Sequence, residues 1–197
     1  LASLARNLSK GKMTDVVHDR AIALLTVAPD LQTMEPCDIV IEAIIEDFDL
    51  KADAFRMLDK VLGPDAIIAT NTSSIPIIDL ATVTTRPQSV LGLHFFNPAP
   101  VQPLVEVVYC LTTDDDVIAR TDTFARDQLG KHIIHTRDRA GFVVNRLLVP
   151  YLLSAIAMLD LERGVVYATT PFGAESWSTL VSDPRTPDHS VAHAASY

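Results

Sequence analysis

The stretch Asp38-Ile-Val-Ile-Glu-Ala-Ile, residues 38–44, is a short and nearly continuous apolar run. A strand buried on both faces of a parallel sheet has this composition, because helices cover both sides of such a sheet. Working outward, two similar runs occupy residues 66–70 and 90–95, and the segment 49–62 between the first two has apolar residues at helical spacing. The alternation of strands and helices predicts an α/β fold with a doubly wound parallel sheet.

Further elements extend the pattern in both directions. We predict strands at 104–110 and 132–136, helices at 75–83 and 115–129, and two helical pieces before residue 27, separated at Gly11, with Thr14 as an N-cap. At Gly141 the strands stop and a long apolar helix begins. We therefore expect a sheet domain at 1–140, one helix of a second domain at 141–164, and a divergent, disordered tail at 165–197.

Composition excludes several classes of protein. The 16 Lys and Arg against 25 Asp and Glu give a net charge of −9, which argues against a nucleic-acid partner. Polar residues interrupt the apolar segment 142–161, so we expect no membrane span. Cys37 and Cys110 lie in apolar runs far apart and the histidines have no metal-ligand spacing, which predicts free thiols in the reducing cytoplasm and no metal site.

Polar residues gather where the predicted strands end, which is where α/β sheets bind ligands. Glu46 and Lys51 follow the first strand, Asn71-Thr-Ser-Ser the second, and His94 and Asn97 mark the end of the third. Glu106 interrupts the next apolar strand, and a buried carboxylate is costly unless it is paired. Pairing with His94 would fix the imidazole's tautomer and make it a general base.

Each of these residues also has a structural alternative. His94 could be a hydrogen-bonded core residue, and Glu106 could face water at a sheet edge. The Asn71-Thr-Ser-Ser segment could cap the following helix, and Glu46 could be a solvated charge in a first helical turn. Asn145 lies in an apolar helix and needs a partner, which could be a backbone carbonyl or a ligand.

The chain resembles the L-3-hydroxyacyl-CoA dehydrogenase family, which includes the 3-hydroxybutyryl-CoA dehydrogenases. Five strings occur in the family's order at near-family spacing: DIVIEAIIE at 38–46, ATNTSS at 69–74, GLHFFNPAPV at 92–101, LVEVV at 104–108 and GFVVNRLL at 141–148. Any one string is a weak signal, whereas all five in order are specific. The resemblance covers residues 1–164 and implies an incomplete Rossmann-type NAD-binding domain followed by the first helix of an all-α domain.

The resemblance implies NAD-dependent oxidation of a 3-hydroxyacyl-CoA to a 3-oxoacyl-CoA, or the reverse reduction of acetoacetyl-CoA, in fatty-acid and butanoate metabolism. His94 would take the hydroxyl proton, and Glu106 would orient and charge-balance it. Ser73 and Asn145 would hydrogen-bond the C3 oxygen of the acyl-CoA substrate. The residues implied to line the NAD site are Glu46, Lys51, Asn71, Ser73 and Asn97.

The sequence also departs from the family. The family's Gly-x-Gly-x-x-Gly turn, whose amides bind the cofactor pyrophosphate, does not occur among the seven glycines. The tail after Gly164 does not resemble the family's substrate and dimer region. We therefore expect a chain truncated at both ends, without the region that makes the family dimeric. A non-catalytic remnant or interaction-only fragment remains the alternative to an enzyme; a piece of a multifunctional β-oxidation protein is a third possibility.

Overall fold

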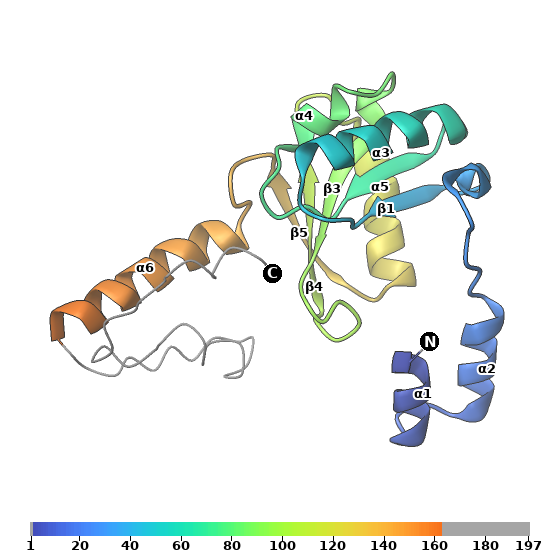
Figure 1. Cartoon of the computed structure of the whole chain (residues 1–197), viewed down its shortest axis with the longest axis horizontal. Helices are drawn as coiled ribbons and strands as arrows, with labels where there is room; N and C mark the ends of the chain where they lie inside the picture. The colour runs from blue at the N-terminus through green and yellow to red at the C-terminus, as the bar shows by residue number, and fades with distance from the viewer. Residues whose placement is uncertain (1, 163–197) are drawn as a thin grey trace. The chain divides into compact units, whose positions relative to one another are not determined.

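A computed structural model describes residues 2–162 of the protein (Figure 1). The chain divides into two compact units, Leu1–Ala140 and a second unit that begins at Gly141. The first unit opens with α1 (Ala2–Ser9) and α2 (Asp15–Ala23). The Thr14 hydroxyl accepts a hydrogen bond from the Val17 amide at 3.4 Å, so the predicted N-cap is confirmed.

Five strands form one sheet in the order in which they occur along the chain: β1 (Ile39–Glu42), β2 (Ile67–Thr70), β3 (Val90–Phe95), β4 (Leu104–Tyr109) and β5 (His132–Arg137). The α/β class is confirmed, but the prediction of a wholly parallel sheet is wrong at one place. β3 and β4 pair antiparallel, whereas the other three pairs are parallel. The reason is the connection 96–103, because a parallel crossover needs about a dozen residues or more.

Helices cover both faces of this sheet. Figure 1 shows α3 (Phe48–Val61) in front of the sheet and α5 (Asp115–Thr123) behind it. The short α4 (Ile77–Ala81) follows β2, and single turns lie at Leu31–Met34 and Pro87–Ser89. The helix predicted to reach residue 129 changes after α5 into a π-helical turn at Phe124–Gln128.

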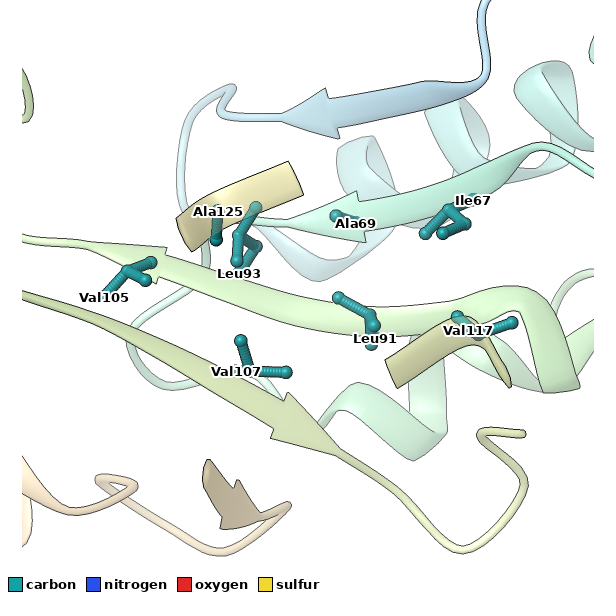
Figure 2. Close-up of a cluster of buried hydrophobic side chains, with 8 residues drawn as sticks. All are labelled: Ile67, Ala69, Leu91, Leu93, Val105, Val107, Val117 and Ala125. Atoms are coloured by element: carbon teal, nitrogen blue, oxygen red, sulfur yellow. The ribbon is translucent and has the colours of Figure 1, made fainter. Parts of the chain in front are cut away.

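The core lies between the sheet and α5. Alternate residues of β2, β3 and β4 point to this side and pack with two residues from α5 and the turn after it, as Figure 2 shows: Ile67, Ala69, Leu91, Leu93, Val105, Val107, Val117 and Ala125. Because side chains alternate along a strand, the residues between them face the other side, where α4 lies. There Gly92 lets Ile77 approach the sheet closely.

The second unit opens with Gly141 at a φ of 73° and continues into α6 (Val144–Glu162). This helix begins three residues after the start of the helix predicted at 141–164, and it contains Pro150. In the described part of the chain, no helix is long and apolar enough to cross a membrane. The predicted disordered tail, 165–197, lies outside the described residues.

Candidate active site

His94 and Glu106 are direct partners in the antiparallel ladder between β3 and β4. Because side chains alternate along a strand, both lie on the sheet face opposite to the core residues of β3 and β4. His94 Nδ1 is 2.6 Å from Glu106 Oε2. The histidine is 6% exposed and the glutamate is fully buried. Since β4 lies between β3 and β5, the alternative that Glu106 faces water at a sheet edge is wrong.

This contact sets what the imidazole can do. A carboxylate on Nδ1 holds the ring in the tautomer that carries a proton on Nδ1, which makes Nε2 the proton acceptor, and it stabilises the imidazolium that forms. The Phe96 ring meets His94 edge to face, with ring centroids 4.8 Å apart, and further fixes its orientation. A hydrogen-bonded core histidine would be equally buried, so this geometry is compatible with His94 as a general base and with His94 as a structural residue.

Glu46 binds the turn that follows β2. Its Oε1 accepts hydrogen bonds from the Thr72 hydroxyl at 2.5 Å, the Ser73 amide at 3.0 Å, and the amide and hydroxyl of Ser74 at 3.1 and 2.9 Å. Partial burial raises the pKa of Glu46, but these hydrogen bonds and the nearby Lys51 ammonium outweigh burial and lower it. Glu46 is thus an ionised acceptor for the hydrogen bonds of this turn, and it precedes α3 instead of lying in the first turn of that helix.

The Thr72–Ser74 turn is a separate structure from α4. Thr72 Oγ1 accepts from the Ile75 amide at 2.9 Å, which closes the turn on itself. The helix begins only after Pro76, with no side-chain cap at that position, and Asp138 binds its Ile78 amide at 2.8 Å. The turn therefore does not serve as the N-cap of the helix, and it presents Ser73 at the carboxyl end of β2.

A buried ion pair lies beneath this turn. Lys51 Nζ is 2.7 Å from Glu42 Oε1, with the two side chains only 1% and 3% exposed. Glu42 Oε2 accepts from the Thr70 hydroxyl at 2.8 Å. Sequence reasoning missed Glu42, although the signal was the one that singled out Glu106, a carboxylate inside an apolar strand.

The three asparagines predicted to belong to the site, Asn71, Asn97 and Asn145, occupy different settings. Asn71 Oδ1 accepts from the Phe95 amide at 2.8 Å, which ties the end of β2 to the end of β3 beside His94. Asn97 is exposed in the loop after β3, where its peptide bond to Pro98 is cis. Asn145 is half-buried in α6 of the second unit. The first unit thus brings together Glu46, Lys51, Asn71, Ser73, His94 and Glu106 around the ends of β1–β3 and the adjoining part of β4.

Lys131 binds the backbone of the loop that contains Asn97. Its ammonium donates to the carbonyls of Ala99 at 2.5 Å and Gln102 at 2.7 Å. Because this loop joins the two strands of the His94–Glu106 pair, Lys131 restrains the connection between them. Nothing in the sequence pattern pointed to this role.

The carboxyl end of β1 has the groups that one end of NAD requires. The Glu46 carboxylate is ionised and suits ribose hydroxyls, and the apolar side chains of Ile44, Ile45 and Phe48 are 47%, 68% and 41% exposed. A planar ring needs such an apolar surface with a few polar groups beside it. The described residues therefore fit the nicotinamide riboside end of the cofactor, while the chain has no glycine-rich turn for the pyrophosphate.

Comparisons with known proteins place the chain in a family. Residues 1–139 match the family model described as 3-hydroxyacyl-CoA dehydrogenase, NAD binding domain. A 3-hydroxybutyryl-CoA dehydrogenase from Mycobacterium tuberculosis is 50% identical over 189 residues, which cover 91% of this chain and 66% of that protein. The match to an NAD-binding domain confirms the predicted cofactor.

Solved structures give the same picture. The crystal structure of FadB2 from M. tuberculosis is similar with a TM-score of 0.81 at 52% identity, covering 84% of this chain and 58% of that chain. That of the (S)-3-hydroxybutyryl-CoA dehydrogenase PaaH1 from Ralstonia eutropha has a TM-score of 0.79 at 39% identity, covering 83% and 57%. The chain thus spans 66% of the M. tuberculosis dehydrogenase and 58% and 57% of the chains in these two crystal structures.

Proposed function

This chain belongs to the 3-hydroxyacyl-CoA dehydrogenase family, and from that premise we propose that it catalyses NAD-dependent interconversion of a 3-hydroxyacyl-CoA and the 3-oxoacyl-CoA. The observation that carries the proposal is the 2.6 Å contact between His94 and the fully buried Glu106, at the end of the sheet where the cofactor-fitting residues lie. The substrate class follows from the names of the relatives, which are 3-hydroxybutyryl-CoA dehydrogenases.

In the oxidation direction, His94 Nε2 takes the proton of the C3 hydroxyl. Glu106 holds the ring from the Nδ1 side and balances the positive charge that develops on it. NAD bound beside Glu46 would supply the hydride acceptor for C3. In the reverse direction the same imidazolium returns its proton to the C3 oxygen.

Ser73 and Asn145 hydrogen-bond the C3 oxygen in this scheme. Such donors stabilise charge that develops on the oxygen as the proton and hydride leave. Support for Ser73 is its place in a turn whose amides Glu46 holds, at the carboxyl end of β2. Support for Asn145 is its place in the GFVVNRLL string, residues 141–148, which resembles the family.

The metabolic setting is part of the proposal. The fatty acid oxidation complex subunit alpha of Shewanella putrefaciens is 40% identical over 156 residues, which cover 79% of this chain and 22% of that protein, and this similarity supports a role in fatty-acid oxidation. The two free cysteines, Cys37 and Cys110, support the cytoplasm as its compartment.

The experiment is NADH oxidation at 340 nm with acetoacetyl-CoA, comparing the wild-type protein with His94→Gln. We expect turnover by the wild type and a loss of at least about a hundredfold in the variant, because general acid–base catalysis contributes about that much or more. His132→Gln is the matched control, since His132 is an exposed histidine on β5. Equal rates for wild type and His94→Gln, or no turnover by the wild type, would reject the proposal; the second result would favour a non-catalytic member of the family.

A further inference from the structure

Strand β3 extends beyond β2 at the edge of the sheet where the site lies. The pairing of these two strands ends with Thr70 opposite Gly92, whereas β3 continues to Phe95. After Thr70 the chain leaves β2 and enters the turn that carries Ser73. The last residues of β3 therefore reach past the part of the strand that is paired with β2.

Asn71 bridges the place where the two strands diverge. Its backbone amide donates to the Glu42 carbonyl of β1 at 2.8 Å, which continues the contact between β1 and β2 by one residue. Its side-chain Oδ1 accepts from the Phe95 amide, also at 2.8 Å. A buried or half-buried backbone amide needs an acceptor, and here a side chain provides the one that a longer β2 would have provided. One residue thus connects the ends of three strands.

This hydrogen bond lies between two groups of the proposed mechanism. Asn71 comes two residues before Ser73, and Phe95 directly follows His94. Ser73 and His94 are both assigned to the C3 oxygen, yet they belong to the ends of different strands. Glu106 holds His94 from the β4 side, and the bond from Asn71 to Phe95 holds the same end of β3 from the β2 side.

We propose that Asn71 is a positioning residue: through Oδ1 it fixes the distance between Ser73 and His94 at the ends of β2 and β3. The assignment deepens the proposed function and rests on it for what these two side chains bind. A donor to the C3 oxygen and a base for its proton act together only if both reach the same atom. The distance between the two strand ends therefore sets how well they can do so.

The test removes the acceptor oxygen, in Asn71→Ala. Amide hydrogen exchange at Phe95 is measured by NMR without ligands, and we expect it to accelerate about tenfold or more, because this amide loses its acceptor. In acetoacetyl-CoA reduction, kcat at saturating NADH should fall about tenfold or more, since a small displacement of reacting groups slows the chemical step. The NADH dissociation constant, from fluorescence titration, should change by a smaller factor than kcat.

Two variants serve as controls, and thermal unfolding shows whether each of them folds. Asn71→Asp keeps an acceptor in the same place and should keep exchange at Phe95 as slow as in the wild type. Gln128→Leu removes an exposed side-chain amide from the turn after α5 and should change neither the exchange nor kcat. If Asn71→Ala does not fold, the wild type still provides a test, because its Phe95 amide must exchange as slowly as the amides in the paired part of β3.

The proposal is overturned if exchange at Phe95 stays unchanged in folded Asn71→Ala, if Asn71→Asp loses the protection as well, or if the wild-type amide is unprotected. It is also overturned if kcat stays within about threefold of the wild-type value although the protection is lost, which is the result that a merely structural bond would give. A dissociation constant for NADH that rises more than about tenfold with unchanged kcat would assign Asn71 to the cofactor instead. If the wild type shows no turnover, the proposed function fails, whereas exchange at Phe95 still decides whether Asn71 holds the end of β3.

Discussion

Replacing Glu106 by glutamine removes the negative charge beneath His94 while keeping the length and shape of a fully buried side chain. The glutamine oxygen can still accept from Nδ1, so the imidazole keeps its tautomer and its orientation. What the variant loses is the attraction between a carboxylate and the imidazolium that forms as the substrate proton is taken. The perturbation therefore isolates charge from geometry.

The magnitude follows from the 2.6 Å contact between Nδ1 and Oε2. Both charges are delocalised, and two unit charges about 4 Å apart interact by about 4 kcal/mol at an effective dielectric constant of about 20. About 1.4 kcal/mol corresponds to a factor of ten in rate, so kcat for oxidation of 3-hydroxybutyryl-CoA should fall about a thousandfold. KM should change little, because the charge acts mainly on the transition state.

The assay is NADH formation at 340 nm with 3-hydroxybutyryl-CoA and NAD, together with thermal unfolding to show that the variant folds. Glu35→Gln, an exposed glutamate of the same unit, is the control for loss of one negative charge. In the double variant His94→Gln/Glu106→Gln, the rate should be no lower than in His94→Gln alone, because the carboxylate acts through the imidazole. A fall of less than tenfold in a natively folded Glu106→Gln would refute the reasoning.

Two further predictions concern stability. Arg86→Met should lower the free energy of unfolding in urea by about 3–5 kcal/mol, because it breaks a nearly buried ion pair with Asp59 at 2.9 Å. Burial raises the pKa of Asp59, but hydrogen bonds, that of Arg86 foremost, lower it overall. Because the carboxylate is favoured in the folded state, the stabilisation by this ion pair is present at neutral pH and is lost as the pH falls below about 4. An equal effect of Arg86→Met on the free energy of unfolding at pH 7 and at pH 3 would contradict this prediction. Gly92→Ala should cost about 1–3 kcal/mol in thermal unfolding, because the new Cβ would lie 2.9 Å from Val108 Cβ, whereas Gly63→Ala, with nothing within 4 Å, should cost less.

The strands were predictable because each is a short apolar run, and β3 begins and ends where the sequence pattern placed it. The direction of β4 was not deduced, although the short connection after Phe95 contains the information. That direction matters for the site. In the antiparallel ladder His94 and Glu106 stand directly opposite each other, and a one-residue shift in register would move one of them to the other face.

The roles of Asn71 and Lys131 could not be predicted, for a different reason. Asn71 binds a backbone amide 24 residues away, and Lys131 binds carbonyls 29 and 32 residues away. Backbone groups are the same at every position, so no sequence pattern distinguishes the one that a side chain will reach. Contacts of this kind depend on how the strands are arranged and are seen only in the folded chain.

Glu42 shows that one rule applied consistently would have found more of the site. Glu42 and Thr70 are partners across β1 and β2, as His94 and Glu106 are across β3 and β4, and all four lie on the sheet face opposite to the core. Among the described residues, no buried side-chain polar atom lacks a hydrogen-bond partner. A polar residue inside an apolar strand therefore predicts a partner on the neighbouring strand at the same level. Here that rule leads from the two carboxylates Glu42 and Glu106 to their cross-strand partners, Thr70 and His94.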